Sequence, residues 1–166
     1  MDLKTETVKW VNGLSNWDRG LLVTCNVHHY LQSQKDKRTL KAIERKITTL
    51  RQNIDNRIFK DKNKHTEIFP VIHRNTSSNH IHILFNTPQH MKRKHFIKDI
   101  ERSIKKTSGI TKAPDKYKDG VLKKGIEVMY DSFGAVDYVL KEIRTADSFE
   151  TISAENIYFG TGKTVE

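Results

Sequence analysis

The sequence predicts an α+β fold, an antiparallel sheet with helices packed on it. Segments rich in β-branched and aromatic residues alternate along the chain with segments whose apolar residues recur every three or four positions. Two of the strand-like segments are joined by a short polar loop, which is typical of an antiparallel hairpin. A chain of 166 residues fits one domain, and we expect its core to span about residues 20–145.

The first predicted elements are a strand and a long helix. Residues 20–27 form an apolar run that is typical of a strand. Residues 36–57 carry apolar side chains at steps of three and four, which predicts a helix with one buried stripe. That stripe consists of Leu40, Ile43, Ile47, Leu50 and Ile54. The pattern is least informative in residues 1–17 and 147–166.

Residues 67–73 and 78–86 are predicted to be the two strands of a β-hairpin. If the hairpin closes around the polar loop between them, His73 lies opposite His80. The other face of the hairpin is then wholly apolar, with Ile68, Pro70, Ile72, Ile81, Ile83 and Phe85. A shift of one residue would bury the histidines and expose this apolar set, so the register is strongly specified.

His80 and His82 are separated by one residue on a strand, so their side chains project from the same face. With His73 on the neighbouring strand, three imidazoles converge, which predicts a metal site. The alternative is a surface pair or a hydrogen-bonded structural pair. Three imidazoles suit Mn²⁺, Zn²⁺ or another transition ion better than Mg²⁺. Glu67 has the same strand parity as His73 but lies further along, and it is a reserve ligand.

An amphipathic helix follows the hairpin. Its apolar residues are Phe96, Ile97, Ile100 and Ile104, and it is expected to end near Ser108-Gly109. Residues 109–120 are expected to form a basic loop, residues 126–130 a strand, and residues 133–144 a helix. The resulting order β-α-β-β-α-β-α is consistent with a ferredoxin-like layer of helices on a sheet.

The helix over residues 133–144 carries a candidate nucleophile. At about 100° per residue, Tyr138, Lys141 and Glu142 lie on the side away from the apolar stripe. A tyrosine on a helix usually packs in the core or at its boundary. Tyr130, the other tyrosine near the site, ends a strand, and we expect it to pack at the boundary of that strand. A tyrosine oxygen can act as a covalent nucleophile, and a divalent metal can polarise a phosphate oxygen for its attack.

The motif His80-Ile81-His82, followed by Tyr138-Val139-Leu140-Lys141, resembles the HUH endonuclease superfamily, in the Rep class with one catalytic tyrosine. The resemblance extends to the element order over residues 20–145. It implies a ferredoxin-like HUH/Rep nuclease fold with a divalent metal, Mn²⁺ or Mg²⁺, on the two motif histidines and a third ligand from the neighbouring strand. It also implies cleavage of single-stranded DNA through a 5′-phosphotyrosine, leaving a free 3′-OH.

The third ligand departs from the Rep pattern, in which it is usually a glutamate or a similar polar residue, because His73 stands at the matching position. Three histidine ligands are typical of conjugative relaxases, and His73, His80 and His82 with Asn86 resemble their metal motif too. Relaxases carry the nucleophile before the histidines, where this chain has only Tyr30. The order of the motifs therefore favours the Rep class.

The resemblance implies that Tyr138 attacks phosphorus and that Lys141 stabilises either the phenolate or the phosphate. The expected role is initiation of rolling-circle replication of a viral or plasmid genome, at an origin or hairpin, with host proteins such as a helicase supplied in trans. One alternative is a single-tyrosine transposase. Another is a non-catalytic nucleic-acid-binding module, which would need neither Tyr138 nor a metal.

The formal net charge of +10 favours an anionic partner. Residues 88–124 hold twelve Lys and Arg against four Asp and Glu, a net charge of +8. Candidate phosphate contacts in this segment are Lys92, Arg93, Lys94, Lys105, Lys106, Lys123 and Lys124. The alternative is that these lysine runs are solvated faces.

The single cysteine, Cys25, excludes a disulfide within the chain and fits a reducing compartment. No apolar stretch approaches the roughly 20 residues of a membrane span, so we expect a cytoplasmic protein with no membrane partner. Residues 160–164 resemble the end of a P-loop, but Ile157 stands where a P-loop needs glycine. We therefore expect no helicase or ATPase domain.

Overall fold

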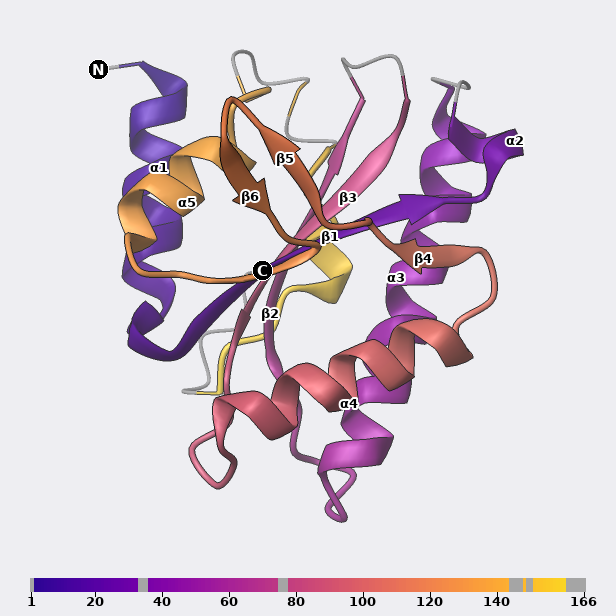
Figure 1. The fold of residues 1–166 in the computed structure, drawn as a ribbon, viewed down its shortest axis with the longest axis vertical. Helices are drawn as coiled ribbons and strands as arrows, with labels where there is room; N and C mark the ends of the chain where they lie inside the picture. Colours follow the sequence, from indigo (N-terminus) through magenta and orange to yellow (C-terminus); the bar gives the residue numbers. More distant parts are fainter. Residues whose placement is uncertain (1, 33–35, 75–77, 144–147, 149–150, 161–166) are drawn as a thin grey trace.

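The computed structural model describes residues 2–32, 36–74, 78–143, 148 and 151–160, and it contains a five-stranded antiparallel sheet with helices on both faces (Figure 1). The strand order is β2 (Glu67–His73), β3 (His80–Asn86), β1 (Gly20–Val27) and β4 (Ile110–Lys112). A further strand, β7 (Ile126–Val128), also pairs with β1. The predicted α+β class with an antiparallel sheet is confirmed.

The β2–β3 hairpin has the predicted register, with His73 opposite His80 and Val71 opposite His82. Its apolar face lies in a core cluster that also holds the buried stripe of helix α3 (Lys37–Ile58) and the apolar residues of helix α4 (Arg93–Lys106). The hairpin residues in that cluster are Ile68, Ile72, Ile81, Ile83 and Phe85. The histidines therefore lie on the opposite face.

The histidine face is covered by helices α1 (Leu3–Leu14) and α5 (Ser132–Val139), which belong to a second core cluster. Helix α1, in a region without a clear sequence pattern, begins after Asp2, whose carboxylate caps the backbone N–H of Thr5 at 2.8 Å. The described residues also contain three short helices: η1 (Trp17–Arg19), α2 (His29–Gln32) and η3 (Ala154–Asn156).

Helix α5 ends at Val139, five residues earlier than predicted, so Lys141 and Glu142 lie in the turn that follows it. The carbonyl oxygen of Val139 accepts a hydrogen bond from His73 at 2.7 Å. The backbone N–H of Ile143 instead donates to Leu140, at 3.0 Å. The competing side-chain donor thus accounts for the early end of the helix.

The expected basic loop over residues 109–120 contains β4 and β5 (Lys116–Lys118), so that prediction was wrong. Strand β5 pairs with β6 (Val121–Lys123) in a separate two-stranded hairpin. Its turn residues Asp119 and Gly120 have φ values of 52° and 76°, as a tight hairpin of this kind requires.

Two features of the sequence fall partly outside the described residues. These are the loop of the β2–β3 hairpin, at residues 75–77, and the P-loop-like segment, at residues 161–164. Within the described residues, no helix is both long enough and apolar enough to cross a membrane.

Candidate metal centre

Three histidines meet at one end of the β2–β3 hairpin. One ring nitrogen from each of His73, His80 and His82 lies within 4.8 Å of the others. The ring centroids of His73 and His82 are 4.2 Å apart, and those of His80 and His82 are 4.8 Å apart. His73 and His82 are buried, whereas His80 is partly exposed. The three side chains are close enough to bind one metal ion.

Backbone carbonyls fix the tautomers of two of these rings. His73 Nε2–H donates to the carbonyl of Val139, which leaves Nδ1 with its lone pair. That Nδ1 atom is buried and has no hydrogen-bond partner among the described residues. His80 Nδ1–H donates to the carbonyl of Ser78 at 3.0 Å, so its lone pair is on Nε2. Contacts of this kind orient histidine ligands in metal sites.

Thr24 holds the third ring, with its hydroxyl 3.0 Å from His82 Nδ1. A hydroxyl can donate or accept, so it is compatible with either tautomer of His82. His82 Nε2 lies 3.1 Å from His80 Nε2. Two ligand nitrogens at 2.0–2.1 Å from one ion, at angles between 90° and tetrahedral, are separated by about 2.9–3.4 Å. The pair is therefore spaced as two ligands of one ion would be.

Burial favours the neutral form of His73 and His82, two of the three candidate ligands. It lowers the pKa of His73 to about 4, against the hydrogen bond to Val139 and the charge of Glu142, which raise it. Burial also lowers the pKa of His82, with added repulsion from His73, His80 and Lys141. Because only neutral imidazole binds a metal, these shifts reduce competition from protons at neutral pH.

Tyr138 and Lys141 lie beside the histidines. The ring centroid of Tyr138 is 5.3 Å from that of His82 and 6.3 Å from that of His73. The ammonium nitrogen of Lys141 is 4.8 Å from the centroid of the Tyr138 ring. Tyr138 remains 47% exposed, so its ring can be approached from solvent. The two motifs that were expected to form one site are thus adjacent.

Sequence reasoning missed two side chains of the site. Thr24 could have been found from the sequence, because it is a polar residue that follows the apolar start of β1. It pairs with His82, so its side chain lies on the same face of the sheet. Glu142 was placed on the exposed side of a helix, yet it is only 8% exposed. Its carboxylate accepts from the backbone N–H of Arg74 at 2.8 Å, and its charge acts on His73.

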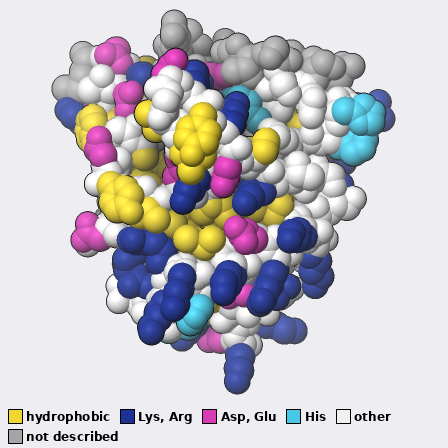
Figure 2. Space-filling model, in the orientation of Figure 1, with side chains coloured by type: hydrophobic (Ala, Val, Ile, Leu, Met, Phe, Trp, Pro, Cys, Tyr) yellow, Lys and Arg dark blue, Asp and Glu magenta, His cyan; other side chains and the backbone are white. Residues whose placement is uncertain are grey.

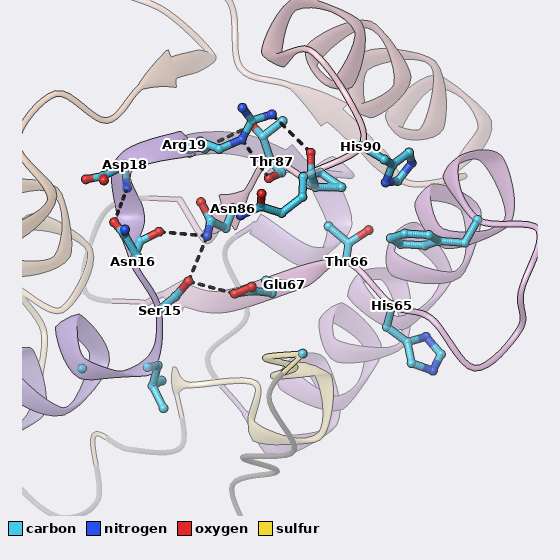
Figure 3. A pocket seen from close by; sticks show the side chains of 16 residues that line it. Ser15, Asn16, Asp18, Arg19, His65, Thr66, Glu67, Asn86, Thr87 and His90 are labelled. Carbon is cyan, nitrogen blue, oxygen red and sulfur yellow. Dashed lines mark hydrogen bonds between the residues drawn. The ribbon is translucent and has the colours of Figure 1, made fainter.

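The reserve ligand, Glu67, lies at the other end of the hairpin, beside a cavity of about 720 Å³ (Figure 3). Its carboxylate accepts from the Ser15 hydroxyl at 2.8 Å, which in turn accepts from the Asn86 amide at 2.9 Å. Six residues of strand separate Glu67 from His73, roughly 20 Å. Neither Glu67 nor Asn86 is brought to the histidines.

The candidate phosphate contacts do not form one cluster. Arg93 is half-buried and donates to the carbonyl of Asp18 at 2.9 Å. The other candidates are exposed: Lys92, Lys94, Lys105, Lys106, Lys123 and Lys124. Helix α4, which carries most of them, packs on the sheet face opposite the histidines. Lys123 and Lys124 directly precede Gly125, whose carbonyl accepts from the backbone N–H of Thr24 at 2.8 Å.

Comparisons of the chain with protein-family models, with curated proteins and with solved structures gave no match. The chemistry of the centre is therefore inferred from its own geometry. That geometry combines converging imidazole nitrogens, a half-exposed phenol and a lysine ammonium.

Proposed function

We propose that the protein is a metal-dependent single-stranded DNA endonuclease with the ferredoxin-like fold of the HUH superfamily, in the single-tyrosine Rep class. The observation that carries the proposal is the 5.3 Å separation between the rings of Tyr138 and His82. It juxtaposes a candidate nucleophile with a cluster of three histidines. A phenol next to a metal centre and a lysine is suited to attack on a phosphodiester.

The ion would be held by His73 Nδ1, His80 Nε2 and His82 Nε2. The unpartnered, buried Nδ1 atom of His73 supports this assignment, because such an atom is costly unless a ligand satisfies it. The all-nitrogen donor set favours Mn²⁺, Zn²⁺ or another transition ion over Mg²⁺. When bound, the ion would polarise the scissile phosphate and neutralise developing charge.

The proposed reaction is a transesterification. The Tyr138 oxygen loses its proton and attacks phosphorus, the new bond is a 5′-phosphotyrosine, and the bond from phosphorus to the 3′ oxygen breaks. The departing 3′ oxygen takes up a proton and becomes a free 3′-OH. Lys141 stabilises the phenolate or the phosphate by its charge. Attack of a 3′-OH on the phosphotyrosine reverses the reaction and rejoins the strands.

The proposed biological role is initiation of rolling-circle replication of a viral or plasmid genome in the host cytoplasm. The substrate would be an origin or hairpin, and a host helicase would unwind the duplex in trans. A transposase of a mobile element would use the same residues at the ends of that element. Cleavage of origin sequences rather than element ends would separate these two roles.

The direct test is formation of a covalent adduct. The full chain is incubated with Mn²⁺ and single-stranded oligonucleotides labelled at the 3′ end, and the products are separated on a denaturing gel. We expect a labelled protein band with the wild type and with Tyr130→Phe, and none with Tyr138→Phe or with EDTA. Binding of the oligonucleotides without an adduct in any metal would instead support the non-catalytic module.

A further inference from the structure

Most of the exposed large hydrophobic side chains lie in one part of the chain. Among the described residues, the exposed ones are Trp10, Tyr30, Tyr117, Val121, Leu122, Tyr130, Phe133 and Tyr138. Six of these eight fall between residues 117 and 138, in the β5–β6 hairpin and around α5. Tyr130, expected to pack at the end of a strand, is instead 92% exposed. A concentration of exposed apolar residues typically marks an interaction surface.

Around α5, the exposed aromatics lie near Tyr138. Phe133 is 56% exposed. At about 100° per residue, Phe133, Gly134 and Tyr138 lie on one half of the helix, and the buried Val136 and Val139 lie on the other half. Asp137, whose carboxylate pairs with the Lys4 ammonium at 3.2 Å, also lies on this half of the helix with Phe133 and Tyr138. Five residues of helix separate the rings by about 7.5 Å along the axis. The helix thus presents two separate aromatic groups to solvent.

The β5–β6 hairpin adds charge to the apolar residues. Tyr117 pairs directly with Leu122, and Lys116 pairs with Lys123. Every residue of both strands is exposed. Figure 2 shows hydrophobic side chains on the face that the hairpin and α5 present in Figure 1, with both Lys or Arg and Asp or Glu side chains between them and mainly Lys and Arg side chains below them.

We infer that Tyr117, Tyr130 and Phe133 form a stacking surface for the bases of single-stranded DNA next to the phosphate that reaches Tyr138. The inference rests on the proposed function and adds positioning residues to it. Aromatic rings interleaved with lysines match the chemistry of a single strand, in which each nucleotide offers a flat base and a phosphate. A protein partner fits less well, because lysine is depleted from protein–protein interfaces.

The test measures equilibrium binding of a fluorescent oligonucleotide to the full chain in EDTA, so that cleavage cannot contribute. Tyr130→Ala should weaken binding roughly 5- to 150-fold, the range found when one stacking ring is removed. Tyr130→Phe should retain wild-type affinity, because stacking needs the ring and not the hydroxyl. Tyr30→Ala is the matched control, since Tyr30 is also an exposed tyrosine, 56% exposed, on α2. It should bind as the wild type does.

An oligonucleotide with abasic sites separates stacking from charge. Wild type and Tyr130→Ala should bind it equally, because the bases that the ring contacts are missing. The inference would be overturned if Tyr130→Ala lost the same affinity for both oligonucleotides, or lost no affinity for either. It would also be overturned if the wild type self-associated and Tyr130→Ala did not. Adduct formation in Mn²⁺ is scored separately. If the wild type forms the adduct and Tyr130→Ala binds DNA as tightly as the wild type, only the stacking surface is ruled out. If Tyr130→Ala binds more weakly but the wild type forms no adduct, only the nuclease activity is ruled out.

Discussion

His73 Nε2 lies 2.7 Å from the carbonyl oxygen of Val139, and this contact ties the histidine cluster to the helix that carries Tyr138. The bond leaves the lone pair of His73 on the buried Nδ1 atom, and its acceptor is the last residue of α5, directly after the tyrosine. The same hydrogen bond therefore links a candidate metal ligand to the helix of the candidate nucleophile.

Replacing His73 should separate these two roles. His73→Gln keeps an N–H donor for the Val139 carbonyl but removes the ligand nitrogen, whereas His73→Ala removes both. We expect both variants to lose Mn²⁺ or Zn²⁺ affinity in calorimetric titrations. In urea unfolding, His73→Ala should be less stable than His73→Gln by about 1–3 kcal/mol, because it leaves a buried carbonyl unsatisfied.

Glu67→Ala is the matched control for those titrations, since Glu67 shares a strand face with His73 but lies at the far end of the hairpin. Its metal affinity should equal that of the wild type. A drop in metal affinity for Glu67→Ala comparable to that for His73→Gln would rule out the three-histidine centre.

Thr24→Val should weaken metal binding roughly 10- to 100-fold, the usual effect of removing a partner that orients a histidine ligand. Valine keeps the shape of threonine but cannot hold His82 Nδ1, which is now 3.0 Å from the hydroxyl. Thr24→Ser restores the hydroxyl and should bind metal like the wild type. Equal affinities for Thr24→Val and Thr24→Ser would show that the hydroxyl does not orient the ring.

The hairpin and its histidines could be predicted from sequence because a two-residue period admits one register. Slipping the β2–β3 pairing by one residue would move a set of fully buried side chains out of one core cluster and put the histidines in their place. Tyr138 could be predicted because α5 has a buried side, with Val136 and Val139, and an exposed side. Both inferences need only local periodicity.

The rest of the site depends on contacts between distant segments. The end of α5 is set by His73, far away in the chain, so helical periodicity alone extended the helix too far. Helix α1 buries only Thr7, Val8 and Val11 and packs against α5, a contact that no local pattern reveals. The β5–β6 strands have no buried side, so they show no alternation, although Asp119-Gly120 is a recognised hairpin signal.

The metal-free protein should lose stability in acid. The folded-state pKa of His73, about 4, lies below its ordinary value of 6.5, so below pH 6.5 the unfolded chain binds a proton that the folded chain does not. Stability is therefore full above pH 6.5 and falls as the pH drops from 6.5 to 4. At about 1.4 kcal/mol per pKa unit, the loss from His73 is on the order of 3 kcal/mol, and His82 adds to it.

Urea unfolding at several pH values in EDTA measures this loss. His73→Gln should flatten the dependence between pH 6.5 and 4, because glutamine does not titrate. An equally steep dependence in that variant would place the titrating groups elsewhere in the protein.

Lys141→Met should slow adduct formation roughly 100- to 1000-fold, a typical cost of losing one electrostatic contact to the reacting groups. If Lys141 stabilises the phenolate, the rising limb of the pH–rate profile should also move to higher pH, because the Tyr138 proton is then harder to remove. If it contacts the phosphate, the rate should fall with no shift of that limb. An unchanged rate would exclude Lys141 from the reaction.

The salt dependence of DNA binding should distinguish the two groups of basic residues. Lys123 and Lys124 adjoin Thr24 through Gly125. In contrast, Lys92 is the N-cap of α4 and Lys94 lies in its first turn, and α4 packs on the opposite face of the sheet. For single strands, log K falls by about 0.7 per neutralised phosphate for each unit of log[salt]. Changing Lys123 and Lys124 to Ala should therefore reduce the slope by about 1.4 if each contacts one phosphate.

The double variant Lys92→Ala, Lys94→Ala removes the same charge and is the matched control. A smaller change in its slope would place the strand along the β5–β6 hairpin, on the way to Tyr138. Equal changes would extend the bound strand to α4, and the sequence-based assignment of Lys92 and Lys94 as phosphate contacts would then hold. If the slope changed in neither variant, these lysines would be solvated side chains that contact no phosphate. Removing a phosphate contact always reduces counterion release and therefore the slope.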